Sequence, residues 1–549
     1  MKCNPWALAA TAVGIWTSLS SGVSAQDDPW PERQKTRSRT SRTDTIGPQV
    51  PVVAWKALTN PTDTASGWGC SPVLDASGRL FVAQDSVVSC LSADTGELFW
   101  QVQFDPEKGI GNGLSLWNGH LLFGSVDDFF YCLNSASGET DWRAPAAPHP
   151  NKGQVVSPDG IVYYPSQQRK VYARRVTDGA LIWEQNVQGS IYATPALSPT
   201  ELLFFFGADW FWFGQRTSDG QNLWTTNVRR EVMETSPVEN GRVYVGSSDY
   251  YLYCLDEQTG TIIWRFWGEK INRSTLAIGH DGTIYHGSGD SSTNWLFAVN
   301  PDGTEKWRFS LAYEIVQPPT VAGDGTIYVA TNDAVPRAGR LYAIRSTGTL
   351  LWSYDFPGSV EFPANLYVSP TLGPDGTLYV LSEDKYLYAF RDWQRATPQD
   401  LAVRYGSVAS GSVADLAKAD GSHLVLSSVS TGPTPFPFLI EATYGQKLLH
   451  KTIGRMDIKL KSRASMGGIL QEIRLKRRGT STYDLIDSRI ISTSDMVAQI
   501  TDIPNAQDYV RAQDGRVEAK VTYRPVVPLF LSSYTVRQDH LEAYVKFVQ

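Results

Sequence analysis

Cysteine has the widest choice of chemistry in this sequence, because a thiol can form a disulfide, act as a nucleophile or bind a metal. Four cysteines follow the N-terminal apolar segment, and they are Cys70, Cys90, Cys132 and Cys254. The last three occupy one position of a repeated segment. Other copies of the segment have alanine there, at Ala173, Ala298, Ala343 and Ala389. A position that accepts either residue is small and apolar, and equivalent positions in neighbouring copies are too far apart for a disulfide. We therefore expect buried structural thiols.

The other candidates for catalysis or metal binding indicate turns. Seven histidines are scattered along the chain, and the one close pair, His280 and His286, flanks a tight turn. The segments SPDG, HDG, GDG and GPDG resemble pieces of calcium-binding loops, but they recur at hairpin positions and lack the full acidic array. The sequence contains no G-x-S-x-G elbow, phosphate loop or H-E-x-x-H motif. We predict no catalytic residue and no metal site.

A glycine followed four residues later by a tryptophan recurs seven times. The tryptophans are Trp100, Trp142, Trp183, Trp224, Trp264, Trp307 and Trp352, separated by 40 to 45 residues. A fixed period of this length indicates a repeat architecture. Each copy also contains short segments rich in β-branched and aromatic residues, such as GRVYV and LYCLD, joined through glycine turns. The sequence therefore predicts four antiparallel strands per copy, which is the blade of a β-propeller.

The number of blades follows from the two ends of the repeat region. Eight sets of three strands can be found, but only seven are followed by the strand that carries glycine and tryptophan. The last set ends in LYAFRDWQ, where Trp393 comes too early. Trp55 lies 45 residues before Trp100 and has no preceding strands of its own. We predict that this first strand pairs with the last blade and closes an eight-bladed propeller, which removes an exposed sheet edge. Seven blades is the alternative.

The regular spacing of Trp55 and the seven repeat tryptophans indicates a structural role. A tryptophan can bridge neighbouring blades, with its ring buried and its N–H bound to the backbone. The pattern Tyr-Ala/Cys-Leu-Asp-x-x-Thr-Gly-x-x-x-Trp resembles the tryptophan-docked repeats of the pyrroloquinoline quinone (PQQ) propeller family, over about residues 50–394. That family includes quinoprotein alcohol dehydrogenases and noncatalytic scaffolds such as the outer-membrane assembly lipoprotein.

For activity, the resemblance implies either a dehydrogenase or a scaffold. The dehydrogenases of the family carry an adjacent cysteine pair that forms a disulfide near the quinone, a calcium ion beside it and an aspartate base. No two cysteines are adjacent in this chain, and no such metal-and-base set can be aligned. We therefore expect no bound cofactor, with PQQ and calcium as the alternative.

The loops that connect one blade to the next are expected to open on one face of the propeller. Their mixed charges suit a polar ligand or a peptide, while an ordinary solvated rim is the alternative. The candidate binding residues are Arg230, Glu231, Lys270, Arg273, Glu314 and Glu361. The segment ELLFFFGADWFWFGQ of the fourth blade is unusually aromatic. We expect it to be buried between blades, with an exposed patch for a sugar or a protein as the alternative.

A second domain is expected after the repeats. The segment QRATPQD resembles a linker, and we place the linker at residues 395–405. Residues 406–549 contain segments of alternating polar and apolar residues, such as ILQEIRLKRRG and VEAKVTYRP, which suggest a β-sandwich. Their order resembles the jelly-roll accessory domains of exported bacterial proteins.

The N-terminus has the features of an export signal. Lys2 precedes an apolar stretch, and residues 23–25 (VSA) form a small-residue cleavage site, so residues 1–25 are expected to be removed. Residues 26–49 are polar and locally basic, and we expect a flexible leader. Contact of this leader with an anionic surface is the alternative. No later segment is long and apolar enough to span a membrane.

Together these features predict an exported, all-β protein with two domains, located in the periplasm or outside the cell. The net charge of -7 and the pI of about 5.6 argue against nucleic acid as a partner. We expect a monomer that acts as a noncatalytic binding or scaffold protein. Its partner would be a protein or a small polar ligand or glycan at the propeller rim. The alternatives are a PQQ- and calcium-dependent dehydrogenase and a carbohydrate-associated protein.

Overall fold

The computed structural model describes residue 31 and most of residues 36–547. The gaps of five or more residues within this range are 61–68, 147–152, 231–235, 269–275, 289–293, 333–338, 357–365, 411–423, 431–437, 448–452, 510–515 and 526–534. The expected signal peptide lies outside the described residues. The elements of the described residues are strands, apart from the short 3-10 helix η3 (Ala506–Tyr509), and the prediction of an all-β fold is confirmed. No helix in the described part of the chain is long and apolar enough to cross a bilayer.

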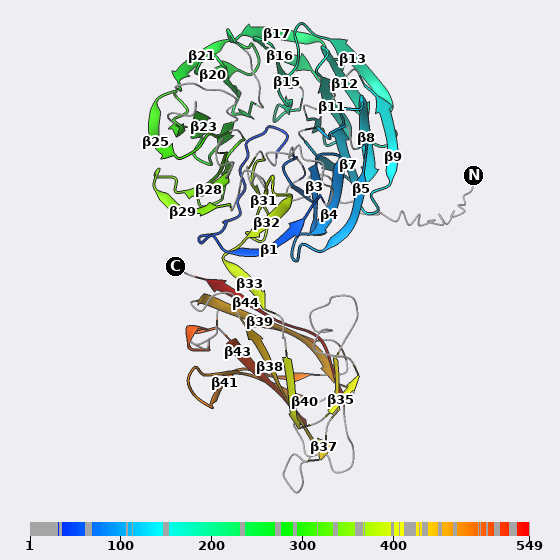
Figure 1. Cartoon of the computed structure of the whole chain (residues 1–549), viewed down its shortest axis with the longest axis vertical. Coiled ribbons are helices and arrows are strands. Elements are labelled where there is room, and N and C mark those ends of the chain that lie inside the picture. The colour runs from blue at the N-terminus through cyan, green and yellow to red at the C-terminus, as the bar shows by residue number, and fades with distance from the viewer. Residues whose placement is uncertain are drawn as a thin grey trace, which may run out of the picture. The chain divides into compact units, whose positions relative to one another are not determined.

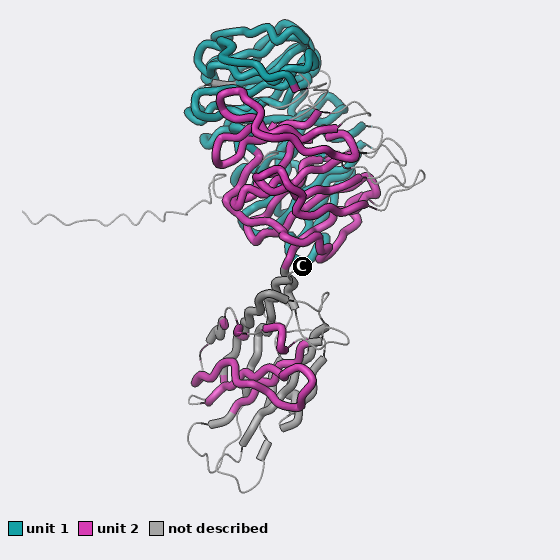
Figure 2. The backbone as a smooth tube through the Cα atoms, turned by 90° about the vertical axis from the view of Figure 1, so that its left-hand side faces the viewer, with its two compact units in different colours: residues 1–40, 70–267 teal, residues 41–69, 268–549 magenta. Residues whose placement is uncertain are grey.

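The chain divides into two compact units, which Figure 2 colours separately. Unit 1 comprises residues 1–40 and 70–267, and unit 2 comprises residues 41–69 and 268–549. Each unit contains four-stranded antiparallel sheets of the kind that the repeat predicts.

Unit 1 holds five of these sheets, and each consists of four consecutive strands (Figure 1). The first sheet is β2 (Val73–Leu74), β3 (Arg79–Gln84), β4 (Val87–Ser92) and β5 (Leu98–Gln103). The second is β6 (Ser115–Trp117), β7 (His120–Gly124), β8 (Phe129–Asn134) and β9 (Thr140–Pro145). The third is β10 (Val155–Val156), β11 (Ile161–Ser166), β12 (Lys170–Arg175) and β13 (Leu181–Asn186). The fourth is β14 (Ala196–Leu197), β15 (Leu203–Ala208), β16 (Phe211–Arg216) and β17 (Asn222–Asn227). The fifth is β18 (Val238–Glu239), β19 (Arg242–Gly246), β20 (Tyr251–Asp256) and β21 (Ile262–Trp267).

Unit 2 holds three more four-stranded sheets. Two consist of consecutive strands: β22 (Leu276–Ile278), β23 (Ile284–Ser288), β24 (Asn294–Val299) and β25 (Glu305–Leu311), then β26 (Thr320–Val321), β27 (Ile327–Asn332), β28 (Gly339–Ile344) and β29 (Leu350–Asp355). The third joins β30 (Thr371–Leu372), β31 (Leu378–Leu381) and β32 (Tyr386–Phe390) with β1 (Val53–Leu58) from far earlier in the chain.

The pairing of β1 with β32 confirms the predicted role of the first strand. Trp55 lies opposite Ala389, just as Trp352 lies opposite Ala343 in the neighbouring repeat. The described residues thus contain eight four-stranded sheets, as many as the predicted blades. Closure of these sheets into one ring stays a prediction.

The C-terminal part of unit 2 forms two six-stranded antiparallel sheets. One contains β33 (Trp393–Ala396), β35 (Ser407–Ser410), β36 (Leu424–Ser427), β39 (Ile453–Ala464), β42 (Met496–Ile500) and β44 (Thr535–Phe547). The other contains β34 (Asp400–Tyr405), β37 (Val429–Ser430), β38 (Phe438–Lys447), β40 (Ile469–Lys476), β41 (Tyr483–Ile491) and β43 (Arg516–Pro525). Along β40, buried and partly exposed residues alternate, so one face of this sheet is covered. A β-sandwich requires two such sheets.

The structure corrects the expectation that residues 395–405 form a linker. β33 pairs with β44 and β34 pairs with β38, so most of this segment belongs to the C-terminal sheets. Pro398 and the surrounding polar residues resemble a linker in sequence. Leu401, Val403 and Tyr405, however, alternate at the spacing of a strand, and the sheet satisfies their backbone groups.

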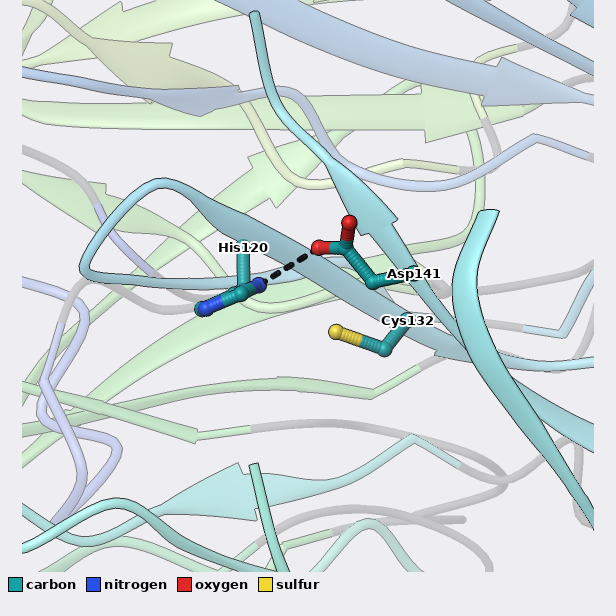
Figure 3. A group of neighbouring side chains, drawn as sticks. All are labelled: His120, Cys132 and Asp141. Atoms are coloured by element: carbon teal, nitrogen blue, oxygen red, sulfur yellow. Dashed lines mark hydrogen bonds and ion pairs between the residues drawn. The ribbon is translucent and has the colours of Figure 1, made fainter. Parts of the chain in front are cut away.

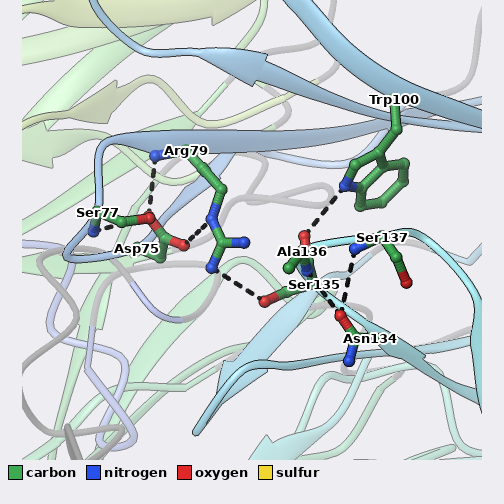
Figure 4. Close-up of polar contacts among 8 residues, drawn as sticks. All are labelled: Asp75, Ser77, Arg79, Trp100, Asn134, Ser135, Ala136 and Ser137. Carbon is green, nitrogen blue, oxygen red and sulfur yellow. Dashed lines mark hydrogen bonds and ion pairs between the residues drawn. The ribbon is translucent and has the colours of Figure 1, made fainter. Parts of the chain in front are cut away.

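Tryptophan docking joins neighbouring sheets of unit 1. The indole N–H of Trp100 donates a hydrogen bond to the carbonyl of Ser135 in the next sheet, at 3.1 Å (Figure 4). Asn134 shapes the accepting turn, because its side-chain oxygen accepts from the N–H of Ala136 and Ser137. The same contact recurs from Trp142 to Val176, from Trp183 to Thr217 and from Trp224 to Glu257, at 2.6 to 3.0 Å. In unit 2, Trp307 donates to Ser346 at 2.9 Å.

The repeat glycine lies directly beneath the tryptophan of the preceding sheet. Gly138, for example, has a φ of 76°, and a Cβ atom added there would lie 2.8 Å from a ring carbon of Trp100. Gly179, Gly220 and Gly260 are placed in the same way under Trp142, Trp183 and Trp224. Glycine is therefore required at this position for two reasons, the left-handed backbone and the lack of space for a side chain.

Replacing such a glycine should destabilise unit 1 by more than backbone strain alone. Gly179→Ala places a methyl group against Trp142, whereas Gly241→Ala meets nothing within 4 Å at a similar φ of 73°. We expect Gly241→Ala to cost about 1 kcal/mol from its left-handed backbone and Gly179→Ala a further ~1–3 kcal/mol from overpacking. Urea unfolding followed by tryptophan fluorescence measures both variants. Equal losses would contradict the docking role.

His286 of β23 is buried in unit 2, and its ring stacks on Phe297 with 5.0 Å between ring centroids. Burial lowers the pKa of His286 from 6.5 to about 4. The unfolded chain therefore binds a proton below pH 6.5 that the folded chain does not bind until about pH 4. This group contributes stability that is fully present above pH 6.5 and is lost as the pH falls towards 4.

The variant His286→Val should remove this acid dependence, because sister strands have valine at the matching position, as in Val245 and Val329. The free energy of unfolding of the unmodified protein should fall by on the order of 3 kcal/mol between pH 7 and pH 4 through His286. In His286→Val, the fall in the free energy of unfolding over this pH range should be smaller by that amount. Denaturant titrations across this pH range test it, and an unchanged slope would refute it.

Candidate binding surfaces

Two of the six predicted rim residues lie within the described part of the chain. Arg230 in unit 1 is exposed, and its backbone N–H donates to the carbonyl of Val228 at 2.9 Å. Glu314 in unit 2 is partly buried, and its carbonyl accepts from the N–H of Asn332 at 3.0 Å. Glu231, Lys270, Arg273 and Glu361 lie outside the described residues. The rim stays a prediction, with Arg230 as its accessible described member.

The first strands of the unit 1 sheets carry a segment that the sequence had assigned to the flexible leader. The carbonyl of Pro31 accepts from Leu116 of β6 at 2.7 Å, that of Arg37 from Leu197 of β14 at 2.9 Å, and that of Ser38 from Val238 of β18 at 2.8 Å. The N-terminal segment thus hydrogen-bonds to the first strands of several sheets in turn.

Arginine side chains fix this segment in unit 1. Arg39 is fully buried, and its guanidinium donates to the carbonyls of Pro195, at 3.0 Å, and Gln154, at 2.5 Å. Arg37 donates to the carbonyl of Val156 at 2.6 Å. A buried guanidinium is tolerated only when hydrogen bonds replace its hydration. Here the backbone carbonyls of Pro195, Gln154 and Val156 provide those hydrogen bonds.

The next residues continue in the same way in unit 2. Ser41 and Thr43 flank a parallel bridge between Arg42 and Val321 of β26, and their backbone groups bond to those of Val321 at 2.9 Å. Arg42 donates to the carbonyl of Gly279 at 3.2 Å. We call residues 36–49 the inner segment.

The inner segment corrects the expectation of a flexible leader for residues 36–49, whereas residues 26–30 and 32–35 lie outside the described residues. Arg39, Ser41, Thr40 and Thr43 are at most 4% exposed. Backbone and guanidinium hydrogen bonds hold the segment in place, so it needs no periodic apolar residues. Its composition therefore resembles that of an unfolded chain. The repeat pattern could not predict its structure, since the segment is not part of a repeat.

The outer strands of unit 1 expose apolar side chains that sequence reasoning missed. The two residues before the docking tryptophan are 43–54% exposed in three sheets, and one of them is 44% exposed in a fourth. We call Leu98, Phe99, Leu181, Ile182, Leu223, Ile262 and Ile263 the outer apolar pairs. They lie on β5, β13, β17 and β21, which are the last strands of their sheets. The signal was visible in the repeats themselves, as LF, LI, NL and II before tryptophan.

Most of the aromatic run of the fourth sheet is buried, as expected. Phe205, Phe206 and Trp212 are fully buried and Phe213 is 6% exposed, whereas Trp210 at the β15–β16 turn is 54% exposed. The alternative of an exposed aromatic patch therefore applies to Trp210 alone among these side chains.

The repeat cysteines are buried thiols. Cys90, Cys132 and Cys254 are fully buried and form no disulfide. Burial raises the pKa of Cys90 and of Cys254 to about 12, and raises that of Cys132 further. Since the thiolate is the reactive form, these groups are unsuited to nucleophilic chemistry at neutral pH. Cys70 is also buried, and its thiol donates to the carbonyl of Gly111.

The family model of the outer membrane protein assembly factor BamB matches residues 52–198, 215–293 and 292–432, which is more than half of the chain. The chain belongs to this family. The resemblance to PQQ propellers is thereby confirmed, and the family match includes the first, second, third and fifth sheets of unit 1 in full and β14 and β17 of the fourth.

Two curated BamB proteins match shorter parts of the chain. BamB of Yersinia pestis is 28% identical over 121 residues, which are 20% of this chain and 29% of that protein. BamB of Burkholderia pseudomallei (strain K96243) is 31% identical over 150 residues, which are 27% of this chain and 36% of that protein. The chain therefore matches only 29% and 36% of the lengths of these relatives.

Solved structures with the same fold include two dehydrogenases. A europium-containing methanol dehydrogenase matches with a TM-score of 0.52 and 14% identity, over 64% of this chain and 89% of that chain. The quinohemoprotein alcohol dehydrogenase from Comamonas testosteroni matches with a TM-score of 0.53 and 12% identity, over 67% of this chain and 81% of that chain. At these identities the likeness establishes the propeller fold alone.

Loss of the Arg39 guanidinium should loosen the inner segment. Arg39→Met removes the hydrogen bonds to the carbonyls of Pro195 and Gln154 and leaves these carbonyls without those donors, so we expect a loss of about 2 kcal/mol or more. Arg175→Met is the matched control, because Arg175 is exposed and pairs only locally with Asp178; its effect should stay within about 0.5 kcal/mol. Thermal unfolding and limited proteolysis of the N-terminal region test both variants. A flexible leader would instead make the two variants indistinguishable.

Proposed function

We propose that this protein is an exported, noncatalytic propeller that binds other polypeptides during the assembly of outer-membrane proteins. The observation that carries the proposal is the outer apolar pairs, exposed at the open edges of four sheets in a member of the BamB family. The names of its curated relatives describe an assembly factor.

The edges of these sheets have the chemistry that an extended polypeptide requires. β5, β13, β17 and β21 each hydrogen-bond to a neighbour on one side only within their sheets. An added strand would gain main-chain hydrogen bonds from the edge, and its side chains would cover the apolar pair. Isolated exposed apolar residues are common, but recurrence at one repeat position on several sheets favours a binding surface.

The inner segment supports the same assignment. It covers the first strands β14 and β18 in unit 1 and β26 in unit 2, where it takes up backbone hydrogen-bonding groups. The outer strands and the loops are therefore the surfaces left to a partner. The rim residues, including Arg230, are a second proposed contact. A periplasmic location and a monomeric state belong to this proposal.

Two other functions remain as alternatives. A PQQ- and calcium-dependent dehydrogenase is favoured by the shared fold of the two alcohol-oxidising enzymes. A carbohydrate-binding role is favoured by the exposed rings of Trp210 and Trp267, which are 54% and 51% exposed. Neither alternative explains the recurring apolar pairs.

Acidic substitutions on the outer strands should abolish partner function without unfolding the protein. The triple variant Phe99→Asp, Ile182→Asp, Ile263→Asp places charges at three exposed positions, and the matched control changes the same residues to serine. In a strain that lacks the chain, the aspartate variant should fail to restore outer-membrane β-barrel levels. The serine variant should restore them in part, because serine removes the apolar contacts but adds no charge that would have to be buried beneath the partner.

Thermal unfolding of purified variants separates loss of binding from loss of fold. Full restoration by the aspartate variant would overturn the role of the outer apolar pairs. Calorimetric titration of the calcium-loaded protein with PQQ tests the enzyme alternative. Stoichiometric PQQ binding together with alcohol oxidation would overturn the scaffold assignment itself.

A further inference from the structure

Three side chains of the second sheet of unit 1 meet at one point. His120 begins β7, Cys132 lies on β8, and Asp141 lies on β9 (Figure 3). One possible ligand atom from each lies within 4.8 Å of the other two. His120 Nδ1 and Asp141 Oδ2 are 2.8 Å apart, with side chains 23% and 30% exposed. Cys132 is fully buried, so its sulfur lies at the base of a group that opens to solvent.

Two sister sheets of unit 1 show what is normal at this place. Cys90 lies opposite Trp100, as Cys132 lies opposite Trp142, and each cysteine is followed by the same register shift. The residue that starts the second strand is Arg79 in that sheet, where His120 stands in the second.

The fifth sheet repeats the arginine. Cys254 lies opposite Trp264, and Arg242 occupies the start of the second strand. Charge from Arg79 and Arg242 acts on the pKa of the respective thiol, so both guanidinium groups lie near their cysteines. In the second sheet this cation is replaced by an imidazole.

Asp141 is a second departure from the repeat at the same place. It stands directly before the docking tryptophan, where most copies have an apolar residue, at Phe99, Ile182, Leu223, Ile263 and Leu351. Compared with the other repeats, the second sheet therefore lacks an apolar side chain and a cation at this place. It has a carboxylate and an imidazole there instead, both beside a thiol. Other copies with alanine in the cysteine position lack the sulfur.

We propose that His120, Cys132 and Asp141 form a binding site for a divalent transition metal, of which Zn²⁺ fits the donor set best. Thiolate, imidazole and carboxylate are the three ligand types that zinc takes from proteins. Three protein ligands on a solvent-facing group leave the fourth position to water. This inference is independent of the proposed function.

Small movements suffice to close the site. Tetrahedral zinc with bonds of ~2.0–2.3 Å holds its ligand atoms roughly 3.3–3.8 Å apart. The pair formed by His120 and Asp141 must therefore open slightly, and the thiol must approach. The rigid sheet fixes the three strands, and Trp117 stacks on the His120 ring with 6.2 Å between centroids. The thiol gives up its weak contact with the carbonyl of Val176, at 3.9 Å.

Metal binding displaces one proton and moves another. The thiol proton of Cys132 leaves to solvent as the sulfur–metal bond forms. A ring proton on Nδ1 of His120 is transferred to Nε2, so that Nδ1 is free to bind the metal. Binding should therefore tighten as the pH rises.

Cobalt titration of the reduced, chelator-treated, full-length protein tests the site. Co²⁺ bound by a thiolate gives a charge-transfer band in the near ultraviolet, and tetrahedral Co²⁺ gives intense visible bands. We expect one Co²⁺ per chain with both signals, and displacement by one equivalent of Zn²⁺. Zn²⁺ should also raise the melting temperature.

Variants taken from the sister sheets provide the controls. Cys132→Ala introduces the residue of other copies and should remove the charge-transfer band. His120→Arg copies Arg79 and Arg242 and should weaken metal binding by at least about 100-fold. Cys90→Ala and Cys254→Ala should leave both bands unchanged.

Three results would overturn the site: no cobalt spectrum at saturation, a charge-transfer band that survives in Cys132→Ala, or its loss in Cys254→Ala. In the first case the His120–Asp141 contact is an ion pair that replaces the arginine of the sister sheets. Circular dichroism of each variant distinguishes loss of metal binding from loss of fold.

Discussion

The docking of a repeat tryptophan onto the glycine turn of the next sheet is the contact on which the repeat structure depends, as Trp100, Trp142, Trp183, Trp224 and Trp307 show. One end of the contact is a hydrogen bond, such as that from Trp142 to Val176, and the other is the missing side chain of Gly179 beneath the ring. Each repeat therefore supplies both a ring for the next sheet and a turn for the preceding one. This reciprocity explains why glycine and tryptophan keep a fixed spacing while the sequence around them varies.

The packing of the repeat also determines which positions can vary in residue type. Interior positions such as that shared by Cys132 and Ala173 accept only small apolar residues, because sheets pack on both sides. Outward positions before the tryptophan are free of that constraint. There the chain has apolar pairs on three sheets, Leu223 alone on a fourth, and Asp141 on the remaining sheet of unit 1. The first strands β14, β18 and β26 bond to the inner segment, so the outer strands are the sheet edges left open.

Periodicity made the strands, the turn glycines and the pairing of β1 with β32 predictable from sequence, since each follows from a pattern repeated many times. The inner segment was not predictable, because Arg39 is held by single hydrogen bonds to the carbonyls of Pro195 and Gln154 that no periodicity announces. The meeting of His120, Cys132 and Asp141 was hidden for a related reason. Their spacing of 12 and 9 residues has meaning only once the register of three strands is known.

The ends of the propeller region place a condition on the order of folding. β1 bonds to β32, and the backbone of Gln49 donates to the Asp392 carboxylate, 343 residues later. Gln49 and β1 thus leave the ribosome long before the last repeat, with which they form these contacts, has been made. Until then β1 is a strand without a partner, with an open edge able to pair with other chains. Completion of unit 2 is therefore a late, long-range step, and the growing chain must be protected from aggregation while it waits.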